Sequence, residues 1–221
     1  MNESDRTYPL RFAVDYPDRP LNRLTTFFRL FTVIPIFIVL ACIDTSFTMQ
    51  YFSDSFFEWT QAKGWNRGAS SGLGLLFVPA LLMLLFRRKY PRWWFDWNLE
   101  LLRFSSRISA YLGLLRDEYP STDEEQAVHL DIDYPDAEQD LNRWLPLIKW
   151  FLAIPHYIVL TLLGIVVLLC LIGAWFAILF TGHYPRALFD LVVGFNRWWL
   201  RVISYAFILV TDQYPPFRLS D

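Results

Sequence analysis

The residues best suited to binding chemistry are two pairs of arginines spaced one helical turn apart. The pairs are Arg103 with Arg107 and Arg197 with Arg201. Two guanidinium groups on one helix face can bind phosphate oxygens bidentately. Four tryptophans accompany them, namely Trp93, Trp94, Trp198 and Trp199, and tryptophan favours the headgroup boundary of a membrane. The pattern predicts lipid headgroup binding. The alternative is ion pairing with nearby carboxylates, namely Asp96, Glu100 and Asp190.

Groups that could catalyse a reaction are sparse. His129, His156 and His183 lie far apart, and no His-Glu-x-x-His, Gly-x-Ser-x-Gly, Gly-x-Gly-x-x-Gly or P-loop motif occurs. Cys42 and Cys170 fall in apolar runs without Cys-x-x-Cys spacing. His156 lies near the end of an apolar run, where we expect an interfacial histidine with satisfied hydrogen bonds. The sequence predicts a protein that is not an enzyme and has no metal or cofactor.

Composition indicates a membrane as the solvent. The chain has 221 residues, of which 54% are hydrophobic and 19% charged, too apolar a balance for a soluble surface. The net charge of -2 gives no basic footprint, which excludes nucleic acid as a partner. The polar start, residues 1–6, predicts no cleavable signal.

Many sequence landmarks occur twice. Asp15-Tyr16-Pro17-Asp18 returns as Asp133-Tyr134-Pro135-Asp136, and Tyr90-Pro91-Arg92 returns as Tyr184-Pro185-Arg186. Such self-similarity is typical of one structural unit used twice. We therefore divide the chain into a first repeat, residues 1–120, an acidic linker, residues 121–127, and a second repeat, residues 128–221.

Apolar runs predict four membrane spans. Phe27 to Ile43 and Gly72 to Phe86 are two, whereas the 34-residue run from Leu147 to Phe180 is too long for one straight span. Matched landmarks are 120 residues apart before these runs and 94 apart after them, so the first repeat has 26 extra residues. The second repeat lacks these 26 residues, so its two spans should be joined directly. This predicts a tight hairpin that turns near Thr161 to Ile165, at Gly164.

The distribution of cations favours this topology. Of the 20 lysines and arginines, only Lys63 and Arg67 lie between the first two spans. The other 18 fall on one side of a four-span protein, which the positive-inside rule assigns to the cytoplasm together with both termini. Each hairpin then enters and leaves on the same side, as in parallel repeats.

Four further segments complete the expected architecture. The stretches from Trp93 to Leu115 and from Ala187 to Val210 predict amphipathic helices that lie flat on the cytoplasmic leaflet. Polar and apolar residues alternate from Arg11 to Tyr16 and from Val128 to Tyr134, which predicts two strands paired in a small cytoplasmic β-ribbon. The fold class is an all-α integral membrane protein with four transmembrane helices in two parallel-repeat hairpins.

The 26-residue insertion is rich in aromatic residues. A partner-docking surface is predicted from its exposed rings, namely Phe52, Phe56, Phe57, Trp59 and Trp65. The alternative is an interfacial cap on the protein's own hairpin.

The second repeat also carries long motifs, which include Ile154-Pro155-His156 and Thr211-Asp212-Gln213-Tyr214-Pro215-Pro216-Phe217. With the stretch from Phe180 to Arg186, they resemble a bacterial membrane-protein family known as domain of unknown function forty-three eighty-nine. The first repeat is a looser copy, with Ile36 in place of the histidine. The resemblance implies a multi-pass protein of the bacterial inner membrane and no particular activity.

Together these features predict a non-catalytic accessory or scaffold subunit that binds membrane lipids and a larger membrane protein complex. The alternative is a small transporter or lipid-translocating protein with a path between the two repeats, which rests on the duplication and His156. The sequence leaves the oligomeric state open.

Overall fold

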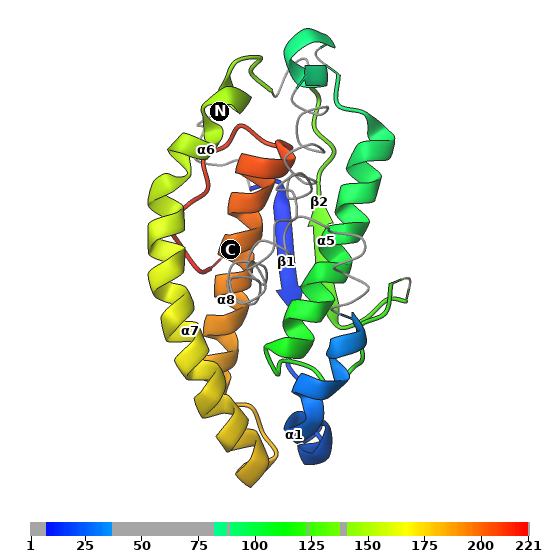
Figure 1. Ribbon diagram of the computed structural model, residues 1–221, viewed down its shortest axis with the longest axis vertical. Coiled ribbons are helices and arrows are strands. Elements are labelled where there is room, and N and C mark those ends of the chain that lie inside the picture. The colour runs from blue at the N-terminus through cyan, green and yellow to red at the C-terminus, as the bar shows by residue number, and fades with distance from the viewer. Residues whose placement is uncertain (1–7, 37–81, 88, 123, 138–140, 221) are drawn as a thin grey trace, which may run out of the picture.

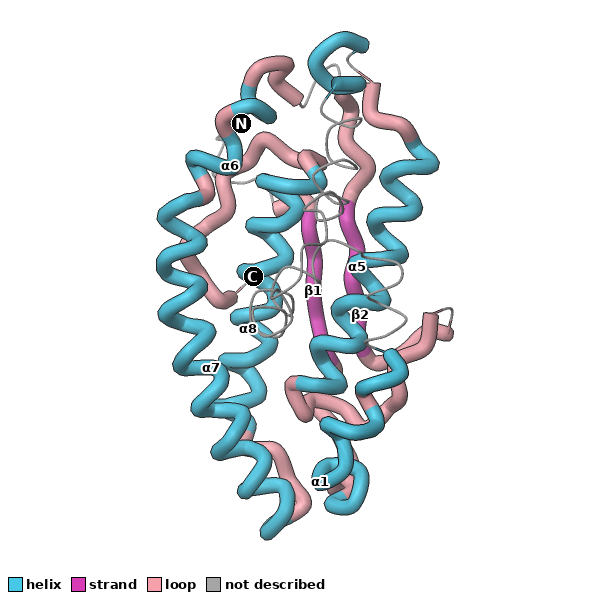
Figure 2. Tube along the Cα trace, viewed as in Figure 1, coloured by secondary structure: helices cyan, strands magenta, loops and turns pink. Residues whose placement is uncertain are grey.

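The computed structural model describes residues 8–36, 82–87, 89–122, 124–137 and 141–220. Within these ranges the chain is mostly helical, and helices pack against one face of a two-stranded sheet (Figures 1 and 2). The α-helices are α1 (Arg23–Thr32), α5 (Arg92–Leu112), α6 (Lys149–Leu152), α7 (Ile154–Thr181) and α8 (Arg186–Ile203). Shorter segments are the π-helices η2 (Met83–Arg87) and η4 (Ser204–Ile208) and the 3-10 helix η3 (Leu145–Leu147).

The sheet is the predicted β-ribbon. Strands β1 (Leu10–Val14) and β2 (Val128–Ile132) pair antiparallel, with Phe12 opposite Leu130. Inward-pointing apolar side chains alternate with outward polar ones, as expected for a sheet with one buried face. The prediction of two paired strands is therefore confirmed.

A helix covers each strand of the ribbon, and the two helices come from different parts of the chain. Strand β1, near the N-terminus, packs against α8, whereas β2 packs against α5 (Figure 1). The buried side chains of both strands and both helices belong to one hydrophobic core. Two predicted helices are also confirmed. The stretch from Trp93 to Leu115 contains α5, and the stretch from Ala187 to Val210 contains α8 and η4.

The predicted hairpin in the second repeat is wrong. Helix α7 continues without interruption from Ile154 to Thr181, through the expected turn at Gly164. One glycine costs a helix only about 1 kcal/mol and leaves its N–H group free to continue the hydrogen-bond ladder. A turn in an apolar environment would instead leave several backbone groups unpaired. The helix ends at Gly182, whose φ of 77° forms a left-handed C-cap.

The first-repeat spans lie mostly outside the described residues. Helix α1 begins at Arg23, where the side chain of Asn22 caps it by accepting from the N–H of Leu24. The rest of the two spans, residues 37–43 and 72–81, remains a prediction. The insertion also lies outside the described residues, including its five candidate docking residues: Phe52, Phe56, Phe57, Trp59 and Trp65.

Helix α1 lies against the C-terminal end of α7. The N–H of Leu21 donates to the carbonyl oxygen of Gly182 at 2.8 Å, and the indole of Trp175 donates to that of Thr26 at 3.3 Å. These contacts place an amphipathic helix from the start of the chain beside the long apolar helix of its second half.

Candidate functional site: an apolar face above a polar framework

Two of the four predicted headgroup-binding arginines attach helices to the ribbon. The Nε group of Arg197 in α8 donates to the carbonyl oxygen of Phe12 in β1 at 3.0 Å. The Nε group of Arg103 in α5 donates to that of Leu130 in β2, also at 3.0 Å. Arg103 also pairs with Glu100 at 2.8 Å, which was the alternative expected from the sequence. Both guanidinium groups thus have partners within the protein.

The other two arginines are buried and bind chain segments that follow the helices. Arg107 donates to the carbonyl oxygen of Ser121 at 2.8 Å, and Arg201 donates to that of Ser220 at 3.0 Å. The structure therefore favours an internal role for these guanidinium groups. Headgroup binding by the arginines stays a prediction.

The four predicted tryptophans are in different environments. Trp198 is buried, Trp94 and Trp199 are half-buried, and the side chain of Trp93 is 68% exposed. Trp94 stacks on Trp97, with 5.6 Å between ring centroids. Of the four, Trp93 is the most available to a membrane.

His156 fastens the C-terminal segment to the start of α7. Its imidazole is fully buried, and its Nδ1 accepts a hydrogen bond from the indole of Trp198 at 3.1 Å. The ring of Phe217 stacks on it at a centroid distance of 4.0 Å, and that of Tyr214 lies at 4.8 Å. Because Nδ1 accepts, the ring proton is on Nε2. The packing is that of a structural histidine. The expectation of satisfied hydrogen bonds is not met, because the buried Nε2 has no hydrogen-bond partner among the described residues.

Two buried ion pairs form a polar framework that the sequence analysis did not identify. The ammonium of Lys149 lies 2.6 Å from a carboxylate oxygen of Asp212, and Arg29 pairs with Asp117. Each carboxylate also accepts an N–H from an asparagine, Asn142 or Asn22 respectively. Two recurring motifs carried part of this signal, Leu-Asn-Arg at residues 21–23 and 141–143 and Asp-x-Tyr-Pro at residues 117–120 and 212–215. The hydrogen bonds from asparagine to aspartate join one motif to the other, whereas the cations lie outside both motifs.

Burial sets the electrostatics of the lysine pair. Lys149 has no exposed surface, and its ammonium also donates to the carbonyl oxygen of Thr211 at 2.7 Å. Burial lowers the pKa of Lys149, and the carboxylate of Asp212 opposes this by stabilising the charged form. The lysine charge therefore depends on its partner.

Other contacts occur twice at matched positions. The hydroxyl of Tyr16 donates to the carbonyl oxygen of Tyr184, and that of Tyr134 donates to the carbonyl oxygen of Tyr90. An arginine also lies over each hydroxyl-donating ring, Arg186 over Tyr16 at 4.5 Å and Arg92 over Tyr134 at 5.7 Å. The two ends of the ribbon are therefore held by the same chemistry.

The π-helix η4 explains a one-residue change in the spacing of matched positions. Tyr111 and Tyr205 are 94 residues apart, whereas Leu114 and Leu209 are 95 apart. These two leucines have left-handed backbones, with φ of 60° and 63°. Because a π-turn contains one more residue than an α-turn, η4 absorbs the extra residue and returns the chain to the same position.

An extensive apolar surface covers α7 and continues onto α1 and α6. We call it the apolar face and define it by exposed residues of these three helices: Leu24, Phe27, Phe28, Phe31, Trp150, Phe151, Ile158, Leu162, Ile165, Leu169, Ile172, Phe176 and Phe180. Phe27 stacks on Trp175, which joins α1 to α7. Among the described residues, α7 is the one helix long and apolar enough to cross a membrane. A face this large calls for a covering, since soluble monomers rarely expose such patches.

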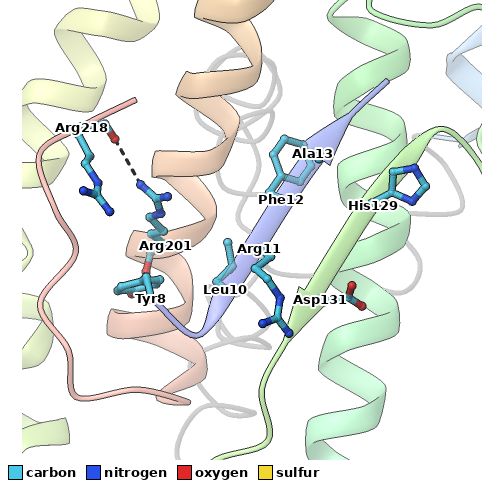
Figure 3. A pocket seen from close by; sticks show the side chains of 9 residues that line it. All are labelled: Tyr8, Leu10, Arg11, Phe12, Ala13, His129, Asp131, Arg201 and Arg218. Carbon is cyan, nitrogen blue, oxygen red and sulfur yellow. Dashed lines mark hydrogen bonds between the residues drawn. The ribbon is translucent and has the colours of Figure 1, made fainter. Parts of the chain in front are cut away.

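A cavity of about 350 Å³ lies between the start of the ribbon and the C-terminal segment (Figure 3). Three charged side chains around it, those of Arg11, Asp131 and Arg201, have partners in the protein. Arg11 pairs with Asp133 at 2.8 Å, and Arg201 donates to the carbonyl oxygen of Arg218. Burial also raises the pKa of Tyr8, whose hydroxyl donates to the carbonyl oxygen of Arg201. We assign no ligand to this cavity. No cluster of metal-ligating side chains occurs among the residues that the structure describes.

The described part of the chain is thus mostly helical, with a two-stranded ribbon that has one buried face and with one candidate membrane helix. Residues 144–218 match the model of the family described as a domain of unknown function (DUF4389). The family predicted from the sequence is therefore confirmed for this segment. The single match does not test the predicted tandem duplication. Comparison with curated proteins and with solved structures gives no match.

Proposed function

We propose that this protein is a non-catalytic accessory or scaffold subunit, which contacts membrane lipids through its apolar face and binds a larger membrane protein complex. The observation that carries the proposal is the exposure of α7. Its most apolar 18-residue window has a mean hydropathy of 2.9, yet only 17% of that window is buried within the protein. A core helix of a soluble protein would be mostly buried, so lipid is the best covering for this surface.

The use of the polar side chains supports a scaffold. Arginines and a lysine that could have bound substrate instead donate to backbone carbonyl oxygens and to aspartates of the same chain, as Arg197 and Lys149 do. Buried polar groups with internal partners rigidify a structure and specify a single arrangement. A rigid frame with an apolar exterior suits assembly better than turnover.

The matched contacts support a further part of the proposal, that the chain arose by tandem duplication. The ion pairs Arg29–Asp117 and Lys149–Asp212 are one such set, and the tyrosine contacts at the ends of the ribbon are another. We place the protein in the bacterial inner membrane with both termini in the cytoplasm, because most cations then lie on the cytoplasmic side. Helices α5 and α8 would lie flat on that leaflet.

The alternative, a transporter with a path between the repeats, receives less support. It depended on His156 as a polar group in a path. That ring is buried between Trp198 and Phe217 and takes part in packing. We therefore retain the scaffold.

Capture of partners from native membranes tests the scaffold. The tagged full chain would be solubilised in mild detergent and its mass distribution compared with that of a variant in which Phe56, Phe57 and Trp59 are replaced by serine. We expect a large assembly for the parent and its loss for the variant. A matched control, Trp93→Ser, changes an exposed aromatic residue elsewhere and should keep the assembly. A monomeric parent protein in every mild detergent would refute the scaffold.

A further inference from the structure

Helix α8 follows α7 back along its whole length. The two helices are joined by the short turn at residues 182–185 and run antiparallel, side by side (Figure 1). Near the start of α7, His156 contacts Trp198. Further along, Gly164 lies against the ring of Phe195. If α7 ran perpendicular to the membrane, α8 would therefore be carried across the same depths.

Helix α8 is too polar to cross a bilayer with α7. Its 18 residues include four charges, those of Arg186, Asp190, Arg197 and Arg201. The side chain of Asp190, the fifth residue of the helix, is exposed. A charged side chain at the centre of a bilayer costs about 2.5–3.5 kcal/mol even on the most lenient scale.

The ribbon adds more charge on the far side of α8. Arg11, Asp133 and Asp131 point outward from it, with side chains between 58% and 63% exposed. His129 and Asp15, whose side chains are 3.2 Å apart, are as exposed. Because β1 packs on α8 beside α7 (Figure 1), a perpendicular α7 would carry these groups toward the hydrocarbon. The outward face of the ribbon requires water.

The length of α7 also fits poorly with a crossing. At about 1.5 Å per residue, 28 residues extend about 42 Å, against a hydrocarbon thickness of about 30 Å. A crossing would also separate Arg143 and Lys149, before α7, from the arginines after it. That division contradicts the positive-inside rule, whereas a helix that does not cross leaves these cations on one side.

We infer that α7 lies in the plane of the membrane, within the acyl-chain region of one leaflet, so that the second half of the chain is monotopic. This inference rests on the proposed membrane association and specifies its geometry. The apolar face contacts acyl chains, α8 lies at the headgroup level, and the outward face of the ribbon is in water. Between its first and last turns, the backbone groups of α7 are satisfied within the helix, so burial of this central part in lipid leaves no unpaired backbone group.

Three exposed isoleucines on one stripe of α7 provide a direct measurement. Ile158, Ile165 and Ile172 are spaced seven residues apart and are 59%, 56% and 50% exposed. The background is the full chain with Cys42→Ala and Cys170→Ala, and each isoleucine in turn would be replaced by cysteine. The single cysteine is labelled with a fluorophore, and the protein is reconstituted in vesicles of phosphatidylethanolamine and phosphatidylglycerol. Nitroxide lipids labelled at shallow and deep positions then report the depth of each fluorophore.

An in-plane helix places all three fluorophores at one depth. A perpendicular helix instead separates neighbouring positions by about 10 Å along the membrane normal. Different depths, with the middle position deepest or a steady gradient, would overturn the inference. Protein that floats with vesicles but shows no quenching at any of the three sites would also overturn it, because a second copy or another protein would then cover the face.

Labelling with a membrane-impermeant maleimide gives an independent readout. Asn142→Cys and His183→Cys replace exposed polar residues before and after α7, outside the apolar face, and Ala13→Cys is an exposed control on the ribbon. We expect all three to react from the same side of sealed vesicles. Reaction of the first two from opposite sides would refute the in-plane placement and leave membrane association intact. Failure of the protein to float with vesicles would refute the proposed function itself.

Discussion

Removal of the carboxylate from the buried Lys149–Asp212 pair should destabilise the protein in a way that alkaline pH relieves. In Asp212→Asn, the ammonium of Lys149 stays buried but loses the carboxylate oxygen that lies 2.6 Å away. Breaking a buried pair from one side costs about 3–5 kcal/mol. For a protein of this length, that loss corresponds to a fall in Tm of roughly 6–20 °C.

The pH dependence follows from the direction of the lysine pKa. Burial already lowers the pKa of Lys149, and loss of Asp212 removes the interaction that opposes this. The unfolded variant then binds more protons than the folded one between this lowered pKa and the usual value of about 10.4, so its stability increases with pH in that interval. The destabilisation is complete at pH below the lowered pKa and disappears as pH approaches 10.4.

The Arg29–Asp117 pair supplies a matched control. Asp117→Asn also leaves a buried cation, but a guanidinium group stays protonated throughout the accessible pH range. Its loss of Tm should therefore persist at pH 10. Thermal unfolding of both variants in detergent, from pH 7 to pH 10, checks the reasoning. Equal pH dependence of the two variants, or an Asp212→Asn protein as stable as its parent, would refute it.

Three other substitutions give separate expectations. Gly182→Ala should lower the free energy of unfolding by about 1–2 kcal/mol, because the backbone at this C-cap is left-handed. The control is Gly173→Ala in helix α7, where an added methyl group meets open space. Its Tm should be unchanged or higher. Arg197→Ala should lower the free energy of unfolding by about 1.5–3 kcal/mol through its lost bond to β1, and should leave vesicle binding unchanged. Unfolding and flotation assays measure the two quantities. Weaker vesicle binding with unchanged stability would instead indicate a lipid-binding arginine. Phe217→Ala removes the ring stacked on His156, an interaction of about 1 kcal/mol. Hydrogen-exchange protection of the C-terminal segment should therefore fall by roughly fivefold. Unchanged protection would contradict the proposal that His156 holds this segment.

The regular elements could be read from the sequence because local patterns specify them. Alternation of polar and apolar residues identified both strands, and the amphipathic Trp and Arg stretches identified α5 and α8. The turn expected at Gly164 was wrong because it was inferred from the spacing of landmarks and the length of a bilayer. Locally, the apolar run from Ile154 to Thr181 is a good helix throughout.

The roles of the charged residues could not be read locally. Arg103 and Arg197 each have a second arginine one helical turn later, which is a spacing typical of phosphate binding. Their partners are nevertheless carbonyl oxygens of the strands. The partner of Arg103 is 27 residues away in sequence, and that of Arg197 is 185 residues away. The same holds for Lys149, whose partner Asp212 is distant in sequence. Such pairings depend on topology, which brings together segments that no local pattern connects.

The way the helices cover the ribbon makes the two halves of the chain dependent on each other. Strand β1 is covered by α8 from the far end of the sequence, while β2 is covered by α5, which precedes it. Neither half can therefore bury its own core without the other. Severing the polypeptide between α5 and β2 would leave two fragments that stay associated as a heterodimer, while either fragment synthesised alone would be a target for proteolysis.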